Sequence, residues 1–123
     1  MKILLKRAYE PWHSDDGYRI LVDRIWPRGV SKEAAAISLW FKDVTPSTSL
    51  RKWFSHDPAK WLEFKKRYIE ELDGRIDAVE EFIGYLSGHD VVTFVYGAKD
   101  INHTHASILK AYIEAKIAPS STR

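Results

Sequence analysis

The sequence predicts an α/β fold in which helices pack on a small sheet of about three or more strands, in a three-layer sandwich. Two strand-like segments come first, helical periodicity follows over residues 58–86, and an apolar strand then precedes a final helix. The length of 123 residues fits one domain spanning residues 1–123. Its polar C-terminal tail, residues 118–123, is expected to fray.

The first two strands are predicted from alternation and from β-forming residues. In residues 2–7 the lysines fall on one face, and Ile3 and Leu5 fall on the other. Residues 18–25 carry apolar side chains on both faces, Ile25 included, as expected of an inner strand covered on both sides. The connection between these strands is short for a parallel crossover. They are therefore predicted to be antiparallel neighbours, or not neighbours at all.

Serine residues mark the starts of two short helices. Ser31 is a predicted N-cap for a helix over residues 32–36, and Ser47 leads into a second helix that contains residues 50–54. The segment between them, up to Asp43, fits neither a helix nor a strand clearly.

The second half of the chain carries the strongest patterns. Asp57 followed by proline predicts the start of an amphipathic helix over residues 58–73, and apolar spacing predicts another over residues 76–86. Six consecutive β-forming residues, 91–96, predict a buried strand because they do not alternate. A last helix is predicted over residues 104–116.

Composition excludes several classes of protein. The chain has no cysteine, which rules out disulfides, thiolate catalysis and cysteine-ligated zinc. A balance of 19 basic against 17 acidic residues is no polyelectrolyte signature, so any nucleic-acid role needs a local basic patch. No signal peptide or membrane-spanning run is apparent, and a cytoplasmic protein without a membrane partner is expected. Walker and Rossmann glycine motifs and a nucleophile elbow are also missing.

The first candidate site follows the strand predicted over residues 18–25. Asp23, Arg24 and Arg28 cluster there beside Gly29. Ligands of α/β proteins bind beyond the carboxyl ends of strands, and arginine suits carboxylate or phosphate. The alternative is an internal Asp23–arginine pair that only fixes the loop.

The second candidate site joins the end of strand 91–96 to the last helix. Lys99 lies in the connecting loop, Asn102 or Thr104 is the predicted N-cap, and His105 falls in the first helical turn. A helix N-terminus favours anions and a neutral imidazole. The alternative is that these loop charges are merely solvated. A His-x-His pair without a third ligand is too weak a signal for a metal, and none is expected.

A third segment, residues 50–56, interleaves basic and aromatic side chains. Arg51, Lys52 and Trp53 would suit single-stranded nucleic acid, although such a stretch is more often a buried amphipathic turn. A homo-oligomer is a further alternative, in which tryptophans form a dimer face: Trp12, Trp26, Trp40 and Trp53.

Several strings of residues resemble the YeaO-like branch of the domain-of-unknown-function 488 family over most of the chain. The resemblance implies a small α/β protein without an established activity. It departs at Thr104, where the branch carries asparagine and longer relatives carry cysteine, so no thiol mechanism is available. The matching strings are residues 16–24 and 26–29, Pro46-Ser47, Leu50-Arg51-Lys52, Trp61, Phe64, Arg67-Tyr68, Tyr96, Ala98-Lys99 and His105-Ala106. The family pattern draws attention to Arg7, Asp23, Arg24, Arg28, Lys99 and His105.

These observations favour a cleft for a small, phosphate-bearing anion between the loops that follow residues 18–25 and 91–96. Arg24 and Arg28 would hold the anion, Lys99 would add charge, and Asp23 with His105 is the candidate acid–base pair. The alternative is a nucleic-acid-binding or regulatory module that uses a basic and aromatic surface. The sequence identifies neither a cofactor nor a reaction.

Overall fold

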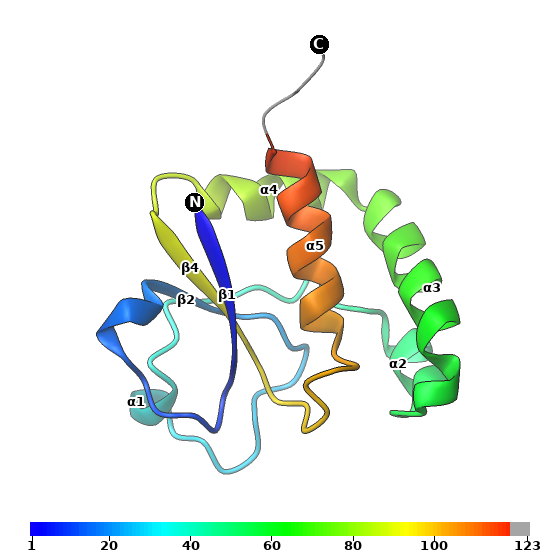
Figure 1. The fold of residues 1–123 in the computed structure, drawn as a ribbon, viewed down its shortest axis with the longest axis horizontal. Helices are drawn as coiled ribbons and strands as arrows, with labels where there is room; N and C mark the ends of the chain where they lie inside the picture. Colours follow the sequence, from blue (N-terminus) through cyan, green and yellow to red (C-terminus); the bar gives the residue numbers. More distant parts are fainter. Residues whose placement is uncertain (119–123) are drawn as a thin grey trace.

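The computed structural model describes residues 1–118 and contains a four-stranded parallel sheet, which confirms the predicted α/β class (Figure 1). The order of strands across the sheet is β1-β4-β2-β3. The strands are β1 (Lys2–Arg7), β2 (Tyr18–Leu21), β3 (Leu39–Trp40) and β4 (Val91–Tyr96).

The first two strands are not neighbours, because β4 inserts between them. Ile3 of β1 aligns with Val92, and Ile20 of β2 aligns with Phe94 two residues further along β4. Both pairings are parallel, so the short connection from β1 to β2 never has to join adjacent strands. The second of the two predicted alternatives is therefore the one observed.

The helices begin where the capping residues predicted. Ser31, Ser47 and Thr104 each accept a backbone N–H with the side-chain oxygen. The segment predicted as one helix over residues 58–73 starts with a 3-10 turn, because the Asp57 side chain caps Pro58–Lys60. The helices are α1 (Lys32–Ala35), α2 (Thr48–Phe54), α3 (Trp61–Asp73), α4 (Ile76–Leu86) and α5 (His105–Ile117), with 3-10 turns at Ser14–Asp16 and Pro58–Lys60.

The predicted end of the second strand is wrong. The strand stops at Leu21, with one further bond from Val22 N–H to the Val95 carbonyl. The chain then leaves the sheet because Asp23 is bonded at both its backbone carbonyl and its carboxylate. Ile25 is consequently 64% exposed instead of buried. The other omission is β3, which is only two residues long.

The two faces of the sheet are covered unequally. One face contributes Ile3, Ile20 and Phe94 to the main core, which α2 to α5 complete. Figure 1 shows these helices gathered on one side of the sheet. The opposite face holds a small cluster around Leu21 and Val95, covered by half-buried aromatic side chains. The third layer of the predicted sandwich is therefore thin.

The thin side also contains a buried ionic cluster. Arg19 is 1% exposed, and its Nη1 donates to Asp16 Oδ2 over 2.6 Å. Its Nε and Nη2 both donate to the Ala35 carbonyl, which attaches α1 to the sheet. Lys6 Nζ lies 3.1 Å from the same Asp16 oxygen, and Thr93 Oγ1 donates to the Asp16 carbonyl. Every polar group of this cluster thus has a partner inside the protein.

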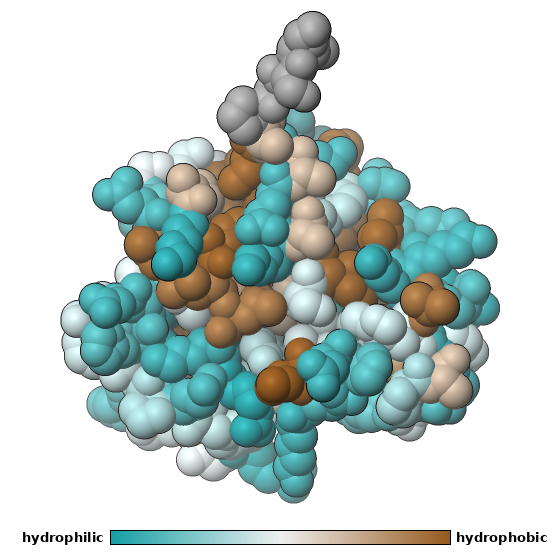
Figure 2. Space-filling model, viewed as in Figure 1, coloured by the Kyte–Doolittle hydropathy of each residue, from teal (hydrophilic) through white to brown (hydrophobic). Residues whose placement is uncertain are grey.

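The outer surface is mostly hydrophilic where the strands end. Figure 2 shows polar side chains concentrated over the lower part of the molecule, where Figure 1 places the loops that follow the strands. Within residues 1–118 no helix is long and apolar enough to cross a membrane. The C-terminal tail, residues 118–123, is predicted to fray. All of its residues after 118 lie outside the described part of the chain.

Candidate functional site

A pocket of about 750 Å³ opens at the carboxyl ends of β2 and β4. This is the edge of a parallel sheet at which α/β proteins bind their ligands. Three segments contribute most of its lining: the loop after β2, the C-terminal end of α2, and the connection from β4 to α5. Among the predicted site residues, Asp23, Arg24, Arg28 and His105 line this pocket, whereas Arg7 and Lys99 do not.

Asp23 joins the loops on either side of the pocket. Its Oδ2 accepts the Gly97 N–H over 2.8 Å, and its backbone carbonyl accepts the Trp40 indole N–H over 2.7 Å. A Cβ atom at residue 97 would lie 3.1 Å from Asp23 Oδ2, so glycine permits this close approach. Asp23 forms no ion pair with Arg24 or Arg28, which argues against the predicted internal pair.

His105 occupies the first turn of α5, as predicted, and contacts with the loop after β2 fix its ring. The ring Nε2 lies 2.7 Å from the Val22 carbonyl and 3.3 Å from Asp23 Oδ1. A carbonyl only accepts, so we assign the hydrogen to Nε2. The Tyr68 ring packs edge-on against the imidazole, with centroids 6.1 Å apart. Nδ1 is therefore the ring nitrogen left for a ligand.

The carboxylate of Asp23 is poorly placed to exchange a proton with a ligand. Its Oδ1 is covered and has no hydrogen-bond partner of good geometry, and its Oδ2 is already bonded to Gly97. The carboxylate instead lies next to the His105 imidazole, with Oδ1 3.3 Å from Nε2, where it helps to position the ring. Of the predicted acid–base pair, His105 therefore keeps one ring nitrogen, Nδ1, without a hydrogen bond among residues 1–118.

The pocket holds cations that have no counter-ion among the described residues. The side chains of Arg24, Arg28, Arg51 and Lys52 make no hydrogen bond or ion pair with residues 1–118. The Nε atoms of Arg24 and Arg51 are even covered without a partner. A buried donor without an acceptor is unusual in a folded protein and calls for an explanation.

The remaining arginines of the described chain are all bonded. Arg19 and Arg67 donate to carboxylates, and Arg75 donates to Glu71 and to two carbonyls. Arg7 Nε donates to the Ala98 carbonyl over 2.9 Å, and its guanidinium lies 5.1 Å from the Tyr9 ring centre. Arg7 therefore supports the β4–α5 connection, and among the arginines of residues 1–118 only those that line the pocket are left unpaired.

Most of the basic and aromatic segment over residues 50–56, which the nucleic-acid alternative joins to the arginine loop in one basic surface, lines this pocket. Arg51 and Lys52 line it, but Trp53 does not. The Trp53 ring instead packs against the Arg67 guanidinium, whose Cζ lies 4.2 Å from the centre of the ring. The sequence shows that Arg51 lies near the end of a capped helix. It does not show that this helix end meets the loop after β2, because the two are far apart in sequence.

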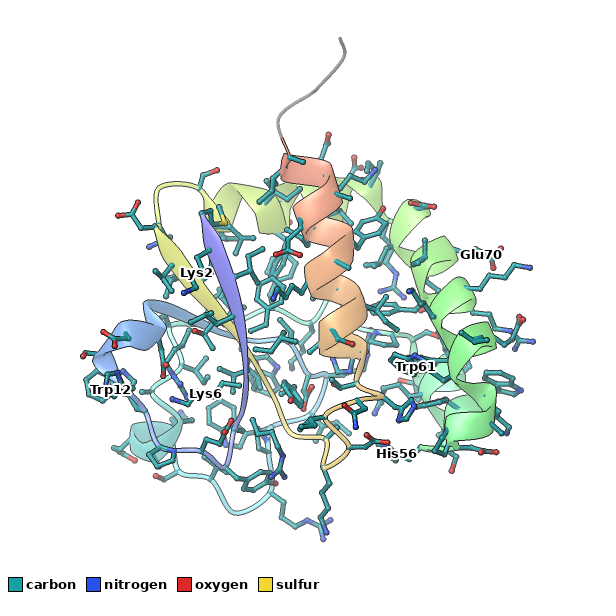
Figure 3. All side chains as sticks on the ribbon, in the orientation of Figure 1. Lys2, Lys6, Trp12, His56, Trp61 and Glu70 are labelled. Atoms are coloured by element: carbon teal, nitrogen blue, oxygen red, sulfur yellow. The ribbon has the colours of Figure 1, made fainter. Side chains whose placement is uncertain are left out.

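The tryptophans do not share one face. Trp26 and Trp40 contact each other with ring centres 5.5 Å apart, on the thin side of the sheet. Figure 3 shows Trp12 at the opposite side of the molecule from α2, the helix that carries Trp53. The predicted dimer face is therefore not assembled in the described structure.

Two more imidazoles line the pocket, although they form no metal site. His56 follows α2, and His103 lies in the β4–α5 connection, where its Nδ1 is 2.7 Å from Asp100 Oδ2. Figure 3 shows His56 below Trp61, whose ring meets His103 edge-on at 5.2 Å. Within residues 1–118 no three histidine or acidic side chains converge as metal ligands.

The fold and the site define a small parallel α/β protein with a cationic pocket at the carboxyl edge of its sheet. The chain belongs to the domain-of-unknown-function 488 family: the sequence profile described as the inactive DUF488-N3 subclade matches residues 2–122. The resemblance deduced from the sequence motifs is confirmed.

Curated relatives cover nearly the whole chain. An uncharacterised protein of Mycobacterium tuberculosis, Rv3073c, is 38% identical over 115 residues, which cover 94% of this chain and 96% of the relative. The uncharacterised protein YeaO of Escherichia coli is 36% identical over 115 residues, covering 94% and 99%. No solved structure matches the chain significantly.

Proposed function

We propose that this protein binds a small, phosphate-bearing anion in the pocket at the carboxyl ends of β2 and β4. One observation carries the proposal: Arg24, Arg28 and Arg51 converge on this pocket and have no partner among residues 1–118. A bound anion would satisfy the donors that the protein leaves open.

The arrangement suits a phosphate group chemically. Guanidiniums from two separate segments, the loop after β2 and helix α2, can each offer paired N–H donors to phosphate oxygens. Lys52 adds a further positive charge at the exposed rim. Hydrogen bonds to charged groups contribute about 1.5–3 kcal/mol each. Micromolar affinity corresponds to about 8 kcal/mol, so more than two such contacts are needed. Lys99 does not line the pocket, so in this proposal it acts on the anion only through its positive charge.

Binding without turnover is the form of this function that we favour. The family profile is described as an inactive subclade. Asp23 accepts the Gly97 N–H and lies 3.3 Å from His105 Nε2. Its role in the proposal is therefore to position the imidazole. His105 would offer Nδ1 to the anion, as an acceptor when neutral and as a donor when charged.

The alternative function is nucleic-acid binding, and one feature of the pocket favours it. Arg51 and Lys52 adjoin the arginine loop and so extend its positive surface. Trp53, the aromatic residue that would stack on a base, is turned toward Arg67 and away from this surface. Affinity for an oligonucleotide that falls steeply with salt concentration would favour this alternative.

The test is a thermal-shift screen with phosphate, sulfate, nucleotides and sugar phosphates on the wild type, Arg28→Ala and Arg67→Ala. Arg28 is exposed and its side chain has no partner among the described residues, so its removal should leave the unliganded melting temperature unchanged. We expect at least one anion to raise the melting temperature of the wild type and of the Arg67→Ala control, with a smaller shift in Arg28→Ala. The proposal fails if no anion stabilises the wild type.

A further inference from the structure

The charge of the pocket exceeds what a single phosphate would neutralise. Among the described residues four cationic side chains line it, and its one carboxylate, Asp23, accepts the Gly97 N–H and lies 3.3 Å from His105 Nε2. A phosphate monoester carries about −1.5 to −2 charges at neutral pH. That charge would leave roughly half of the cationic groups without a counter-ion. A diphosphate matches the cation set better.

The size of the pocket also exceeds that of an inorganic anion. A volume of about 750 Å³ falls within the range of roughly 300–1,000 Å³ that holds drug-sized ligands. The ligand should therefore carry a sizeable group besides its phosphates.

Apolar and aromatic side chains define the chemistry of that group. Ile25 is 64% exposed and Tyr9 is 49% exposed, and both line the pocket next to half-buried Trp26. The floor is formed by Phe54 and Phe64, whose rings stack with centres 4.3 Å apart. A flat ring placed against these side chains would remove exposed apolar surface from water.

We infer that the anion bound in this pocket is a nucleoside diphosphate, with its phosphates on the arginines and its base against Ile25, Tyr9 and Trp26. The inference rests on the proposed function and specifies its ligand. Stacking on aromatic side chains tolerates any base, since every base has a π face. The identity of the base is therefore an outcome of the experiment.

The experiment is isothermal titration calorimetry of the full chain with ADP, GDP, CDP, UDP, pyrophosphate and a single-stranded oligonucleotide. The variant is Ile25→Ser, and the control is Leu62→Ser, because Leu62 is 81% exposed and lies outside the pocket. Both side chains are largely exposed, so neither change should disturb folding.

We expect at least one nucleoside diphosphate to bind about tenfold or more tightly than pyrophosphate, from burial of the base. Ile25→Ser should weaken that nucleotide several-fold and leave pyrophosphate unchanged, whereas Leu62→Ser should change neither. The inference is overturned, with the proposed function intact, if pyrophosphate binds as tightly as all four nucleotides. Tighter binding of the oligonucleotide than of every nucleotide also overturns it. If no anion binds at all, the proposed function fails as well.

Discussion

The protein contains two clusters in which an aspartate and an arginine lie close together in sequence, and they are built in opposite ways. In the first, Arg19 and Asp16 are buried together, and their polar atoms are bonded to each other and to the backbone. In the second, Asp23 accepts the Gly97 N–H and lies 3.3 Å from His105 Nε2, while the side chain of Arg24 beside it has no partner among residues 1–118. We call these the closed cluster and the open cluster.

The difference separates structural charge from charge that is available for binding. The closed cluster attaches the turn at residues 14–16 and helix α1 to the thin side of the sheet. The open cluster shares its pocket with Arg51 from α2, another cation without a partner among residues 1–118. An arginine near a strand is therefore insufficient to identify a binding site, and the absence of a protein partner is the informative feature.

The largest expected effect comes from opening the closed cluster. Arg19→Met removes the donors to Asp16 and Ala35 and leaves the buried carboxylate with only Lys6 and the His13 N–H as partners among residues 1–118. Breaking a buried pair in this way costs about 3–5 kcal/mol. Urea unfolding should report that loss of free energy of unfolding. A loss below about 1 kcal/mol would mean that the cluster is not structural.

A smaller effect is expected from Asp23→Ala in the open cluster. The change leaves the Gly97 N–H without its acceptor and His105 without its carboxylate. We expect the free energy of unfolding to fall by about 1–3 kcal/mol, measured in urea against Asp15→Ala, whose carboxylate is exposed. Unchanged stability would show that Asp23 does not join the two loops.

The closed cluster should also control stability in acid. Burial alone would raise the pKa of Asp16, but bonds from His13 N–H, Lys6 and Arg19 outweigh it and hold that pKa below the usual 3.8. A lowered folded-state pKa stabilises the protein fully above the unfolded-state value, and the contribution disappears as pH falls through the folded-state value. Unfolding measurements from pH 5 to pH 2 should show a decline that Asp16→Asn reduces. An equal decline in both proteins would contradict this assignment.

The smallest expected effect is the most telling for the comparison. Arg51→Met keeps the apolar stem of the side chain and removes a charge that has no partner among residues 1–118. The free energy of unfolding should change by no more than about 0.5 kcal/mol, or rise because repulsion in the pocket decreases. A loss of about 2 kcal/mol or more would show that Arg51 has a structural role.

Most of the fold could be predicted from local patterns, because capping residues and apolar spacing act over a few positions. Ser31, Ser47 and Thr104 cap helices as predicted, and β4 has the predicted bounds. Strand β3 could not be predicted, since two residues carry no periodicity. The end of β2 was also missed, because it depends on contacts of Asp23 with Trp40 and Gly97, which are distant in sequence.

The candidate site was predictable only in part, for the same reason. The cluster of Asp23, Arg24 and Arg28 is visible as a string of polar residues after a strand. The contribution of Arg51 arises from packing α2 against the loops, and the separation of Lys99 from the pocket arises from the path of residues 97–104. Neither effect has a local signature in the sequence.

The central claim is that the unpaired arginines exist to bind an anion. The most direct test is isothermal titration calorimetry of pyrophosphate into the wild type, Arg51→Gln and the control Arg67→Gln, whose arginine is paired with Glu63 outside the pocket. We predict saturable binding to the wild type, unchanged affinity in Arg67→Gln, and affinity reduced about tenfold or more in Arg51→Gln. Equal affinity in Arg51→Gln and the wild type would contradict the claim.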